Sequence, residues 1–479
     1  MKKRSLIFSI FVFVTLISFG QNEENHIIRG SIIDKNTNEV LPYANIVILQ
    51  KYKGTVSNEK GSFSFDLSPF SAQDTLSFQF IGYKSHKVLV NQTTPEMTVY
   101  LEEDMINLSE AFVYGNPPNP KDIIKKVVEN KDKNYKYISS NNQVFIRSRD
   151  ITDIENLSTN VKKLSIDQLD EDLIQNTVKK VPRHITSYTD FLGNLYFFEG
   201  KSDSLKVDPK RTVSLKEEDI AEFEQIGKIF ENLFKDTGEE EYWKIKSGIF
   251  GQKLDIQEEE NDSITETPIS NDSSSTRYMR SSIRYWLEYS SIENTDEWEF
   301  LYSPGKYKYT LTGGTRVNGE DVFIIDFTPK SGGEYIGRVY VSTESYALIK
   351  ADYEYAAGKT GRDIHLLGIG YTEDYFKASI YFEKIEDSYQ LKYFSKKAGK
   401  HFSINRSLQL IKKRKRWLLN KTLKEMKLRL KMAANQEESV EVLFLNHEKI
   451  SNESFAQFNQ PKKMKIQYIE QFHDDLWIG

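Results

Sequence analysis

The chain has 479 residues, of which 38% are hydrophobic, 13% aromatic and 28% charged, a composition typical of a folded globular protein. At roughly 150 residues per domain, this length predicts about three domains. A formal net charge of −5 gives little attraction for nucleic acid or for an anionic membrane. The chain contains no cysteine, which excludes disulfides, thiol nucleophiles and cysteine metal sites, so packing has to stabilise the fold.

The first twenty residues follow the pattern of a secretory signal peptide. Three basic residues at positions 2–4 precede an almost wholly apolar run over residues 5–19, and the small Gly20 ends this run. The alternative is a membrane anchor, but about fifteen apolar residues are fewer than the ~20 that span a bilayer. We therefore predict a signal peptide over residues 1–20 and an exported product. Removing three of the 65 basic residues leaves 62 against 70 acids, a formal charge of −8.

Residues 26–102 predict a small β-sandwich, because short period-two runs alternate with turn residues. A polar turn spans residues 34–39, and a second covers Asn58–Gly61, where Gly61 can take a positive φ at a hairpin exit. The alternating positions are Ile28, Gly30 and Ile32; Ala44, Ile46 and Ile48; Phe63, Phe65 and Leu67; Leu76, Phe78 and Phe80; and Met97, Val99 and Leu101.

This module resembles the carboxypeptidase regulatory-like domain, a transthyretin-like sandwich. The motifs that carry the resemblance are Gly30–Asp34, Leu41–Ile46, Gly54-Thr55, Gly61–Phe63 and Phe80–Tyr83, while Asn58 stands where an acidic residue is more usual. The family is common as an N-terminal extension of TonB-dependent receptors and other Gram-negative envelope proteins. The resemblance therefore implies the periplasm or outer membrane of a Gram-negative cell, and it does not imply peptidase activity.

Residues 103–137 predict a linker followed by a helix. Leu108–Gly115 resembles the connector that follows this sandwich in such receptors. Asn119 can cap a helix that begins at Pro120. The run Pro120–Tyr135 is similar to a helix in uncharacterised envelope proteins, which implies a non-receptor envelope protein of unassigned activity. The apolar face of this helix would consist of Ile123, Ile124, Val127 and Val128.

Residues 138–479 predict an antiparallel β-domain with one helical insertion, at residues 214–236. Ser214–Glu217 has the pattern of a capping box, and apolar residues then recur at helical spacing until Gly238. The alternative of a membrane-surface helix is disfavoured, because acids dominate the polar side. Residues 254–276 are acidic and serine-rich, which predicts a mobile loop.

Strand patterns are nearly continuous from Arg277 onward. Sequential hairpin-linked strands, with turns such as Asn318-Gly319, favour a large curved antiparallel sheet. Gly337–Lys350 resembles the strand–turn–strand of periplasmic half-barrels that carry lipoproteins. An open half-barrel, a filled sheet and a closed barrel all fit this pattern. The expected strands are Tyr307–Leu311, Val322–Phe327, Gly337–Val341, Tyr346–Tyr355, Ile364–Tyr371, Lys377–Glu383, Tyr389–Phe394 and Phe402–Leu410.

The concave face of a half-barrel can stay unfilled, so aromatic side chains on it could bind an acyl chain or an apolar peptide. The alternative is an ordinary core packed by the helical insertion, because aromatic residues in strands are usually buried. The candidates for this apolar binding face are Tyr307, Tyr309, Phe323, Phe327, Tyr353, Tyr355, Phe376, Tyr381 and Tyr393.

The sequence offers no recognisable catalytic, cofactor or metal site. The seven histidines are scattered singly, and His447-Glu448 lacks the second histidine of a zinc-protease helix because position 451 is Ser451. The His473–Asp475 cluster fits a solvated terminal loop better than a cation site. No nucleophile elbow, phosphate-binding glycine loop or dinucleotide fingerprint is present. We therefore expect no enzyme activity and no cofactor.

The basic run Lys412, Lys413, Arg414, Lys415 and Arg416 is the strongest local charge pattern. It could contact anionic lipid or lipopolysaccharide phosphates. The alternative is a hairpin turn with solvated charges. We do not expect an exported acidic protein to bind nucleic acid.

The predicted fold is mainly β: a transthyretin-like sandwich, a short helix and a large curved antiparallel β-domain with a helical insertion. The predicted function is non-enzymatic binding or assembly in the cell envelope, with the sandwich docking a protein partner and the β-domain presenting a binding surface. A periplasmic carrier of lipid or lipoprotein is the first alternative, and a hydrolase with an unrecognised site is the second.

Overall fold

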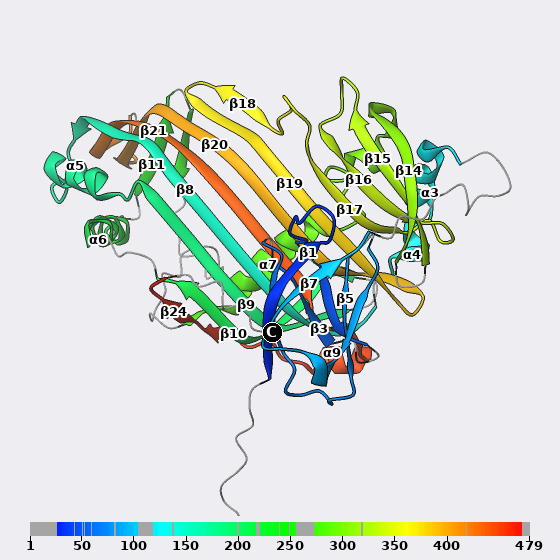
Figure 1. Ribbon diagram of the computed structural model, residues 1–479. Helices are drawn as coiled ribbons and strands as arrows, with labels where there is room; N and C mark the ends of the chain where they lie inside the picture. The colour runs from blue at the N-terminus through cyan, green and yellow to red at the C-terminus, as the bar shows by residue number, and fades with distance from the viewer. Residues whose placement is uncertain are drawn as a thin grey trace, which may run out of the picture. The chain divides into compact units, whose positions relative to one another are not determined.

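The computed structural model describes residues 26–42, 44–49, 51, 53–58, 60–80, 83–103, 118–136, 138–198, 201–216, 221–238, 240–248, 250–254, 273–317, 320–417 and 419–471. The predicted signal peptide, the connector, most of the predicted mobile loop and the Asn318-Gly319 turn lie outside these residues. The chain divides into two compact units, an N-terminal one and one formed by residues 105–473 (Figure 1). The predicted fold class is confirmed, because both units are built mainly from strands.

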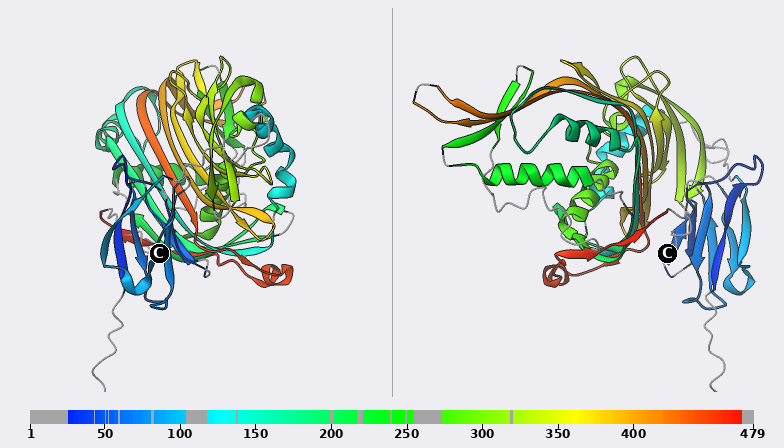
Figure 2. Two further views of the ribbon diagram at one scale, coloured as in Figure 1. Left: turned by 45° about the vertical axis from the view of Figure 1, so that its right-hand side comes forward. Right: turned by 90° about the vertical axis from the view of Figure 1, so that its left-hand side faces the viewer.

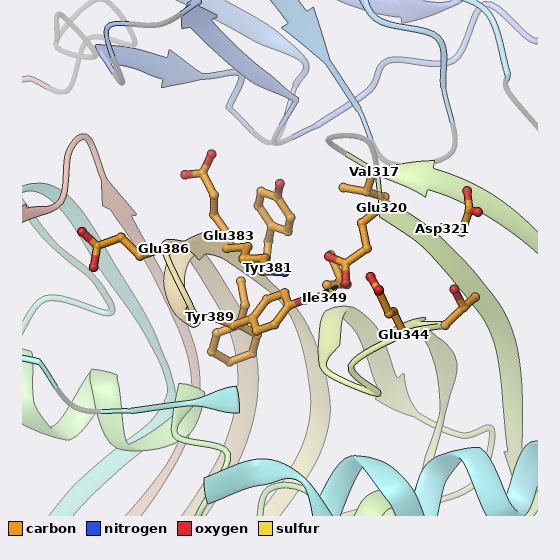
Figure 3. Close-up of a pocket in the computed structure, with 12 residues that line it drawn as sticks. Val317, Glu320, Asp321, Glu344, Ile349, Tyr381, Glu383, Glu386 and Tyr389 are labelled. Atoms are coloured by element: carbon orange, nitrogen blue, oxygen red, sulfur yellow. Dashed lines mark hydrogen bonds between the residues drawn. The ribbon is translucent and has the colours of Figure 1, made fainter. Parts of the chain in front are cut away.

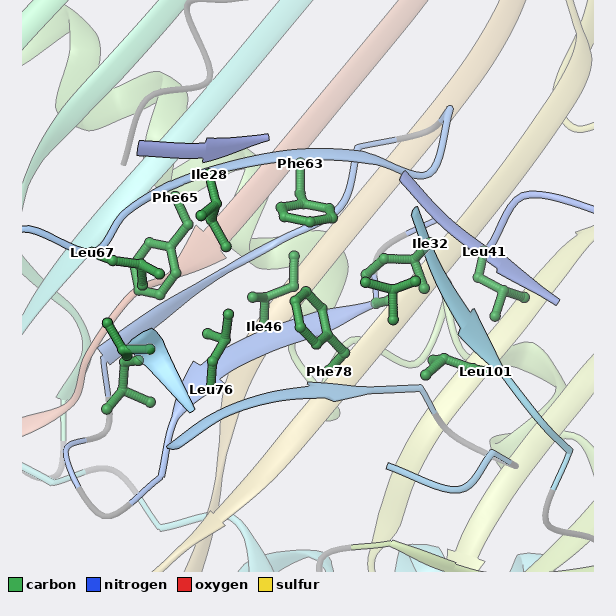
Figure 4. Packing of buried hydrophobic residues seen from close by; sticks show 14 residues of the cluster. Ile28, Ile32, Leu41, Ile46, Phe63, Phe65, Leu67, Leu76, Phe78 and Leu101 are labelled. Carbon is green, nitrogen blue, oxygen red and sulfur yellow. The ribbon is translucent and has the colours of Figure 1, made fainter. Parts of the chain in front are cut away.

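The N-terminal unit is a sandwich of two small sheets with one shared core. The first sheet has the order β4 (Ser62–Asp66), β1 (Ile27–Asp34) and β7 (Glu96–Leu101). The second has the order β3 (Lys53–Val56), β2 (Asn45–Ile48), β5 (Thr75–Gln79) and β6 (His86–Leu89), and the short helix η1 (Val90–Gln92) follows it. The predicted alternating residues supply the core between the sheets (Figure 4), among them Ile28, Ile32, Ile46, Phe63 and Phe78.

Two glycines of the sandwich are required by close backbone geometry. A Cβ at Gly30 would lie 1.8 Å from the carbonyl oxygen of Met97, so only glycine lets β1 and β7 approach this closely. Gly61 has φ +71° and ends the predicted turn, in which the side chain of Asn58 accepts hydrogen bonds from the backbone of Lys60 at 2.9 Å and Ser62 at 3.0 Å. The predicted hairpin exit at Gly61 is therefore confirmed.

The second unit is one large sheet that curls into an open trough (Figure 2). Neighbouring strands along its main path are antiparallel, except for the parallel pair β10–β24. The path runs through β14 (Tyr307–Val317), β15 (Glu320–Pro329), β16 (Tyr335–Ser342), β17 (Leu348–Tyr355), β19 (Ile369–Ile385), β20 (Ser388–Arg414), β21 (Lys421–Phe444), β8 (Ser140–Leu164), β9 (His184–Phe198), β10 (Lys201–Leu215) and β24 (Gln467–Ile469).

Short strands and helices complete this unit. The strands β11 (Glu241–Ser247), β12 (Phe250–Leu254), β18 (Asp363–Leu366) and β22 (Glu448–Lys449) join the sheet at its sides, and β13 (Ser273–Ser275) pairs with β23 (Lys463–Lys465). The helices are α3 (Pro120–Glu129), α4 (Lys131–Asn134), α5 (Glu171–Lys180), α6 (Ala221–Lys235), α7 (Thr276–Ser290), α8 (Glu299–Tyr302), η2 (Pro304–Lys306) and α9 (Asn452–Gln457). Helices α5, α6 and α7 lie inside the curve of the sheet (Figure 2).

Helix α3 begins where the sequence predicts it. The side chain of Asn119 accepts a hydrogen bond from the backbone of Lys121 at 3.0 Å, and Pro120 occupies the first turn. Ile123, Ile124 and Val127 are buried, as their spacing predicts. Within the described residues, no helix combines the length and the apolar composition that crossing a bilayer requires.

The predicted helix start at Ser214 is wrong. Ser214 belongs to β10, where it pairs with Thr189 of β9 and forms a 3.0 Å hydroxyl–hydroxyl hydrogen bond with it. Helix α6 is described only from Ala221. Pairing between β9 and β10 therefore decides the conformation at Ser214. The residue types of a capping box also occur at the ends of strands, so the local pattern alone did not identify a helix.

Two further expectations for the β-domain are corrected. Continuous strands from Arg277 give way to α7, on which Met279 and Ile283 are buried four residues apart, and α5 is a further helix, so the single helical insertion is also wrong. The expected strand Ile364–Tyr371 is instead the β18–β19 hairpin, because Leu367 and Gly368 take positive φ values of 50° and 79°. In addition, the expected strands at 389–394 and 402–410 are parts of the single strand β20, which has 27 residues.

Candidate functional site

Six of the nine predicted aromatic residues meet in one cluster on strands β14 to β19. Phe300 of α8 stacks on Phe327 with ring centroids 4.3 Å apart and meets the edge of Tyr353 at 5.0 Å. Trp298 covers Tyr353 at 5.9 Å and is fully buried. The six are Tyr307, Tyr309, Phe327, Tyr353, Tyr355 and Phe376. Trp298, which precedes α8, and Phe300 of α8 therefore cover the aromatic face here.

The other three predicted aromatics lie elsewhere. Phe323 is buried on β15, and Tyr393 is buried on β20, where its hydroxyl donates to Glu441 Oε1 at 3.4 Å. Tyr381 lines a surface pocket. The sequence did not single out Trp298 or Phe300, because a four-residue helix such as α8 has too few positions to show a periodic pattern.

The pocket has a volume of about 650 Å³ and lies where three hairpin turns of the sheet meet (Figure 3). Successive antiparallel strands place every second turn at the same end of a sheet, so the β14–β15, β16–β17 and β19–β20 connections converge there. The lining residues are Val317, Glu320, Asp321, Thr343, Glu344, Ile349, Tyr381, Phe382, Glu383, Lys384, Glu386 and Tyr389. The sequence did not reveal this site, although acids beside alternate turns are a recognisable pattern.

A hydrogen-bond network fixes the inner wall of the pocket. The Tyr389 hydroxyl donates to Glu320 Oε1 at 2.6 Å and lies 2.9 Å from the Ser345 hydroxyl, and Ser342 also donates to Glu320. Burial and the bond to Glu320 raise the pKa of Tyr389 to about 12. Tyr389 therefore stays protonated at neutral pH and acts as a donor that orients Glu320.

The lining carries five carboxylates against the single ammonium of Lys384. Asp321 pairs with Arg316 at 2.7 Å, Glu383 with Lys392 at 3.6 Å, and Glu386 with Lys449 at 3.8 Å. The arrangement can hold a cation electrostatically. The pocket lining contains no histidine. In the part of the chain that the structure describes, no group of three or more acidic or histidine side chains could hold a metal ion.

The basic run divides into structural and exposed charges. Lys412 is buried, with Nζ 2.8 Å from Glu241 Oε2 and 2.7 Å from the carbonyl oxygen of Asp236. Arg414 contacts the same carboxylate through Nη2 at 2.6 Å. Lys412 and Arg414 together lower the pKa of Glu241 to about 2. Lys413 is half-buried, while Lys415 and Arg416 are exposed at the end of β20.

A half-covered apolar stripe lies on the concave face between α6 and α7. On β20, Leu410 packs with Leu233 of α6, and Lys396 Nζ lies 3.7 Å from the ring centroid of Tyr289 on α7, so even-numbered positions of this strand face inward. The stripe consists of half-buried aliphatic and aromatic side chains between the contact of Leu410 with α6 and the contact of Lys396 with α7. Its members are Phe402, Ile404 and Leu408 of β20 and Leu428, Leu430 and Met432 of β21.

Comparison with known proteins agrees with the resemblance of the N-terminal unit. Residues 28–113 match the family model of the CarboxypepD_reg-like domain. No curated protein matches the chain.

Two solved structures are similar at very low identity. A LolA superfamily protein from Nitrosomonas europaea is 10% identical, with 71% of this chain and 98% of that chain covered and a TM-score of 0.17. The MucA/MucB complex of Pseudomonas aeruginosa gives 7% identity, coverage of 67% and 93%, and a TM-score of 0.18. With TM-scores below 0.5, these likenesses establish neither a shared fold nor a shared function.

Proposed function

We propose that this protein is a non-enzymatic binding protein of the cell envelope whose β-domain holds a cationic segment of a partner protein in the pocket between Val317 and Tyr389. The observation that carries the proposal is a pocket of about 650 Å³ lined by five carboxylates, of which Glu320 and Glu344 form no ion pair within the described residues. Pockets of this size hold small ligands or a few side chains. Buried lining residues such as Ile349 and Phe382 add apolar surface.

A lysine or arginine side chain of the partner fits this combination. Its aliphatic stem would lie against Ile349 and Phe382, and its charged head would reach the exposed Glu344 and Glu386. Electrostatic complementarity of this kind sets the specificity and the rate of association. The fixed Glu320–Tyr389 pair would form a preorganised acceptor at the inner wall.

The envelope setting comes from the N-terminal part of the chain. We place the protein in the periplasm or at the outer membrane, because the first twenty residues have the pattern of a signal peptide and the following module belongs to a type found in envelope proteins. The sandwich would dock a second protein, so that the chain links two partners. Neither role requires catalysis.

Peptide binding tests the proposal. Fluorescence anisotropy with a labelled lysine-rich peptide should show saturable binding to the mature protein, and the double variant Glu344→Gln, Glu386→Gln should bind about tenfold more weakly. The control is Glu354→Gln, since Glu354 is an exposed acid of β17 that pairs with Lys377 at 3.6 Å and does not line the pocket. Equal affinity of the double variant and the control variant would contradict the proposal.

A second candidate function is the transport of an apolar ligand. It is favoured by the half-covered stripe that includes Phe402, Leu428 and Leu430, because a lipid chain could displace water from these side chains. Mass spectrometry of the purified protein should then detect a lipid that co-purifies. The variant Leu430→Asp should lose this lipid and keep the peptide affinity of the pocket, whereas a lipid-free wild-type preparation argues against a carrier.

A further inference from the structure

The tip of the β20–β21 hairpin exposes two large apolar side chains to solvent. Trp417 is 95% exposed and Leu419 is 82% exposed, more than any other large hydrophobic residue of the described chain. Exposed apolar side chains at the end of a projecting element mark a surface that another phase or molecule covers. Figure 2 shows this hairpin projecting beyond the rest of the sheet.

The hairpin tip is held in place by the strands beneath it. Arg414 pairs with Lys421 in the ladder, and β11 pairs with β20 along its other side up to Arg414. The side chain of Asn420 accepts from the backbone of Arg416 at 3.3 Å and donates to the Tyr242 hydroxyl at 3.0 Å. The residues on both sides of the apolar pair are therefore anchored to the strands.

Basic residues flank these two side chains in the sequence. Residues 413–421 contain five basic and no acidic residues. Arg414 forms an ion pair with Glu241. The other four basic residues form no side-chain ion pair within the described part of the chain: Lys413, Lys415, Arg416 and Lys421. Two acids lie near these residues: Asp167 pairs with Lys424 at 3.0 Å, and exposed Glu240 accepts a hydrogen bond from the Lys415 backbone N–H at 2.8 Å through its carbonyl oxygen. Lys413, Lys415, Arg416 and Lys421, which we name the basic collar, are thus available to an anionic partner.

We propose that the β20–β21 hairpin docks on an anionic bilayer surface, with Trp417 and Leu419 in the interface and the basic collar against the lipid phosphates. Tryptophan prefers the boundary between headgroups and acyl chains, because its ring is apolar and its N–H is polar. Lysine and arginine near the surface are attracted to anionic headgroups, and this attraction acts together with apolar insertion. We choose a membrane as the partner because a bilayer surface offers both anionic phosphates for the basic collar and an apolar layer for Trp417 and Leu419.

The β18–β19 hairpin provides a matched comparison. Its tip also exposes apolar side chains, with Ile364 at 52% and Leu366 at 64% exposure. However, residues 363–369 contain no lysine or arginine, and Asp363 contacts His365 at 3.0 Å, so this tip lacks a basic collar. The proposal therefore predicts membrane binding through Trp417 and not through Leu366.

Membrane docking goes beyond the proposed pocket function, because the two sites lie at opposite ends of β20. The pocket surrounds the start of the strand at Ser388, and the hairpin tip follows its end at Arg414. The 27 residues of β20 give a path of about 85 Å along the strand. One site can therefore fail without affecting the other.

Vesicle flotation tests the proposal. The mature full-length protein should float with vesicles of phosphatidylglycerol and phosphatidylethanolamine and should stay unbound with vesicles of phosphatidylcholine alone. The variants Trp417→Ala with Leu419→Ala, and Lys415→Gln with Arg416→Gln, should each reduce the bound fraction about tenfold. The control Ile364→Ala with Leu366→Ala should bind like wild type. Matching thermal unfolding curves would verify that all variants fold.

Fluorescence provides a second readout. The chain has five tryptophans, of which Trp243 and Trp298 are fully buried, Trp286 is half-buried and Trp477 lies outside the described residues. The part of any vesicle-induced blue shift that Trp417→Phe removes therefore reports on Trp417, and this variant should abolish most of the shift while it keeps most of the binding. Three results would overturn the proposal: no flotation with anionic vesicles, equal loss in the control variant, or an unchanged bound fraction after Trp417→Ala with Leu419→Ala.

Discussion

The two ends of strand β20 carry opposite charge. At its start, Ser388 and Tyr389 adjoin a pocket with five carboxylates, and at its end Lys415 and Arg416 precede an exposed tryptophan. At both ends some charged side chains form internal bonds, and others are exposed and can contact a partner. Glu320 and Lys412 are fixed by internal bonds, whereas Glu344 and Lys415 are exposed. The buried and the exposed residues of a charged run therefore have to be considered separately before the run is assigned a function.

The largest effect should follow from breaking the structural charge at the hairpin base. Lys412→Ala leaves Glu241 with Arg414 as its remaining cationic partner at this site, and removal of one partner from a buried ion pair costs about 3 kcal/mol. Lys415→Ala, three residues along, should change the free energy of unfolding by less than about 0.5 kcal/mol. Chemical denaturation measures both. Similar values for the two variants would remove the distinction between structural and exposed charges.

The same comparison can be made at the pocket end. Glu320→Ala removes an acceptor used by the hydroxyls of Tyr389 and Ser342, and the loss should destabilise the protein by about 2 kcal/mol. Glu344→Ala should be nearly neutral, because Glu344 is exposed. Thermal unfolding of the two variants distinguishes them, and a neutral Glu320→Ala would show that the network does not fix the pocket wall.

A smaller effect should depend on pH. Burial raises the pKa of Glu297, on the loop before α8, from 4.5 to about 7. The native state then keeps a proton that the unfolded state has released, so stability falls as pH rises from about 4.5 to 7. Glu297→Gln should remove this slope and stabilise the protein by about 1–2 kcal/mol at pH 8, because Glu297 is partly exposed and its burial penalty is reduced. Urea unfolding at several pH values measures this slope. A Glu297→Gln variant whose free energy of unfolding falls with pH as steeply as that of the wild type would contradict the prediction.

The smallest expected effect concerns salt. Raising the ionic strength from 0.05 M to 0.15 M should weaken peptide binding at the pocket by about threefold, because exposed carboxylates are screened. The double variant Glu344→Gln, Glu386→Gln should show a weaker dependence. A salt-independent affinity in the wild type would indicate that apolar contacts dominate the pocket.

Local patterns predicted the parts of the fold that depend on local physics. Alternation located the sandwich core around Ile28 and Phe78, and Asn119-Pro120 located the start of α3. The helix start at Ser214 failed, because pairing with Thr189, 25 residues away, decides the conformation there. The pocket was missed for the same reason, since Glu320 and Glu383 become neighbours only when the order of the strands is known.

The candidate residues show the same division. The basic run was visible in the sequence, but the contact between Lys412 and Glu241 depends on the pairing of β11 with β20. Likewise, Tyr353 and Phe376 could be identified as strand aromatics, whereas their cover, Trp298 and Phe300, comes from an irregular segment that no periodic pattern marks.

Co-flotation of a labelled lysine-rich peptide with the protein on anionic vesicles tests the separation of the two ends most directly. The account predicts that the wild type carries the peptide to the vesicles, that the Glu344→Gln, Glu386→Gln variant floats without peptide, and that the Trp417→Ala, Leu419→Ala variant binds peptide without floating. Competition between peptide and vesicles, or loss of both activities in either variant, would contradict it.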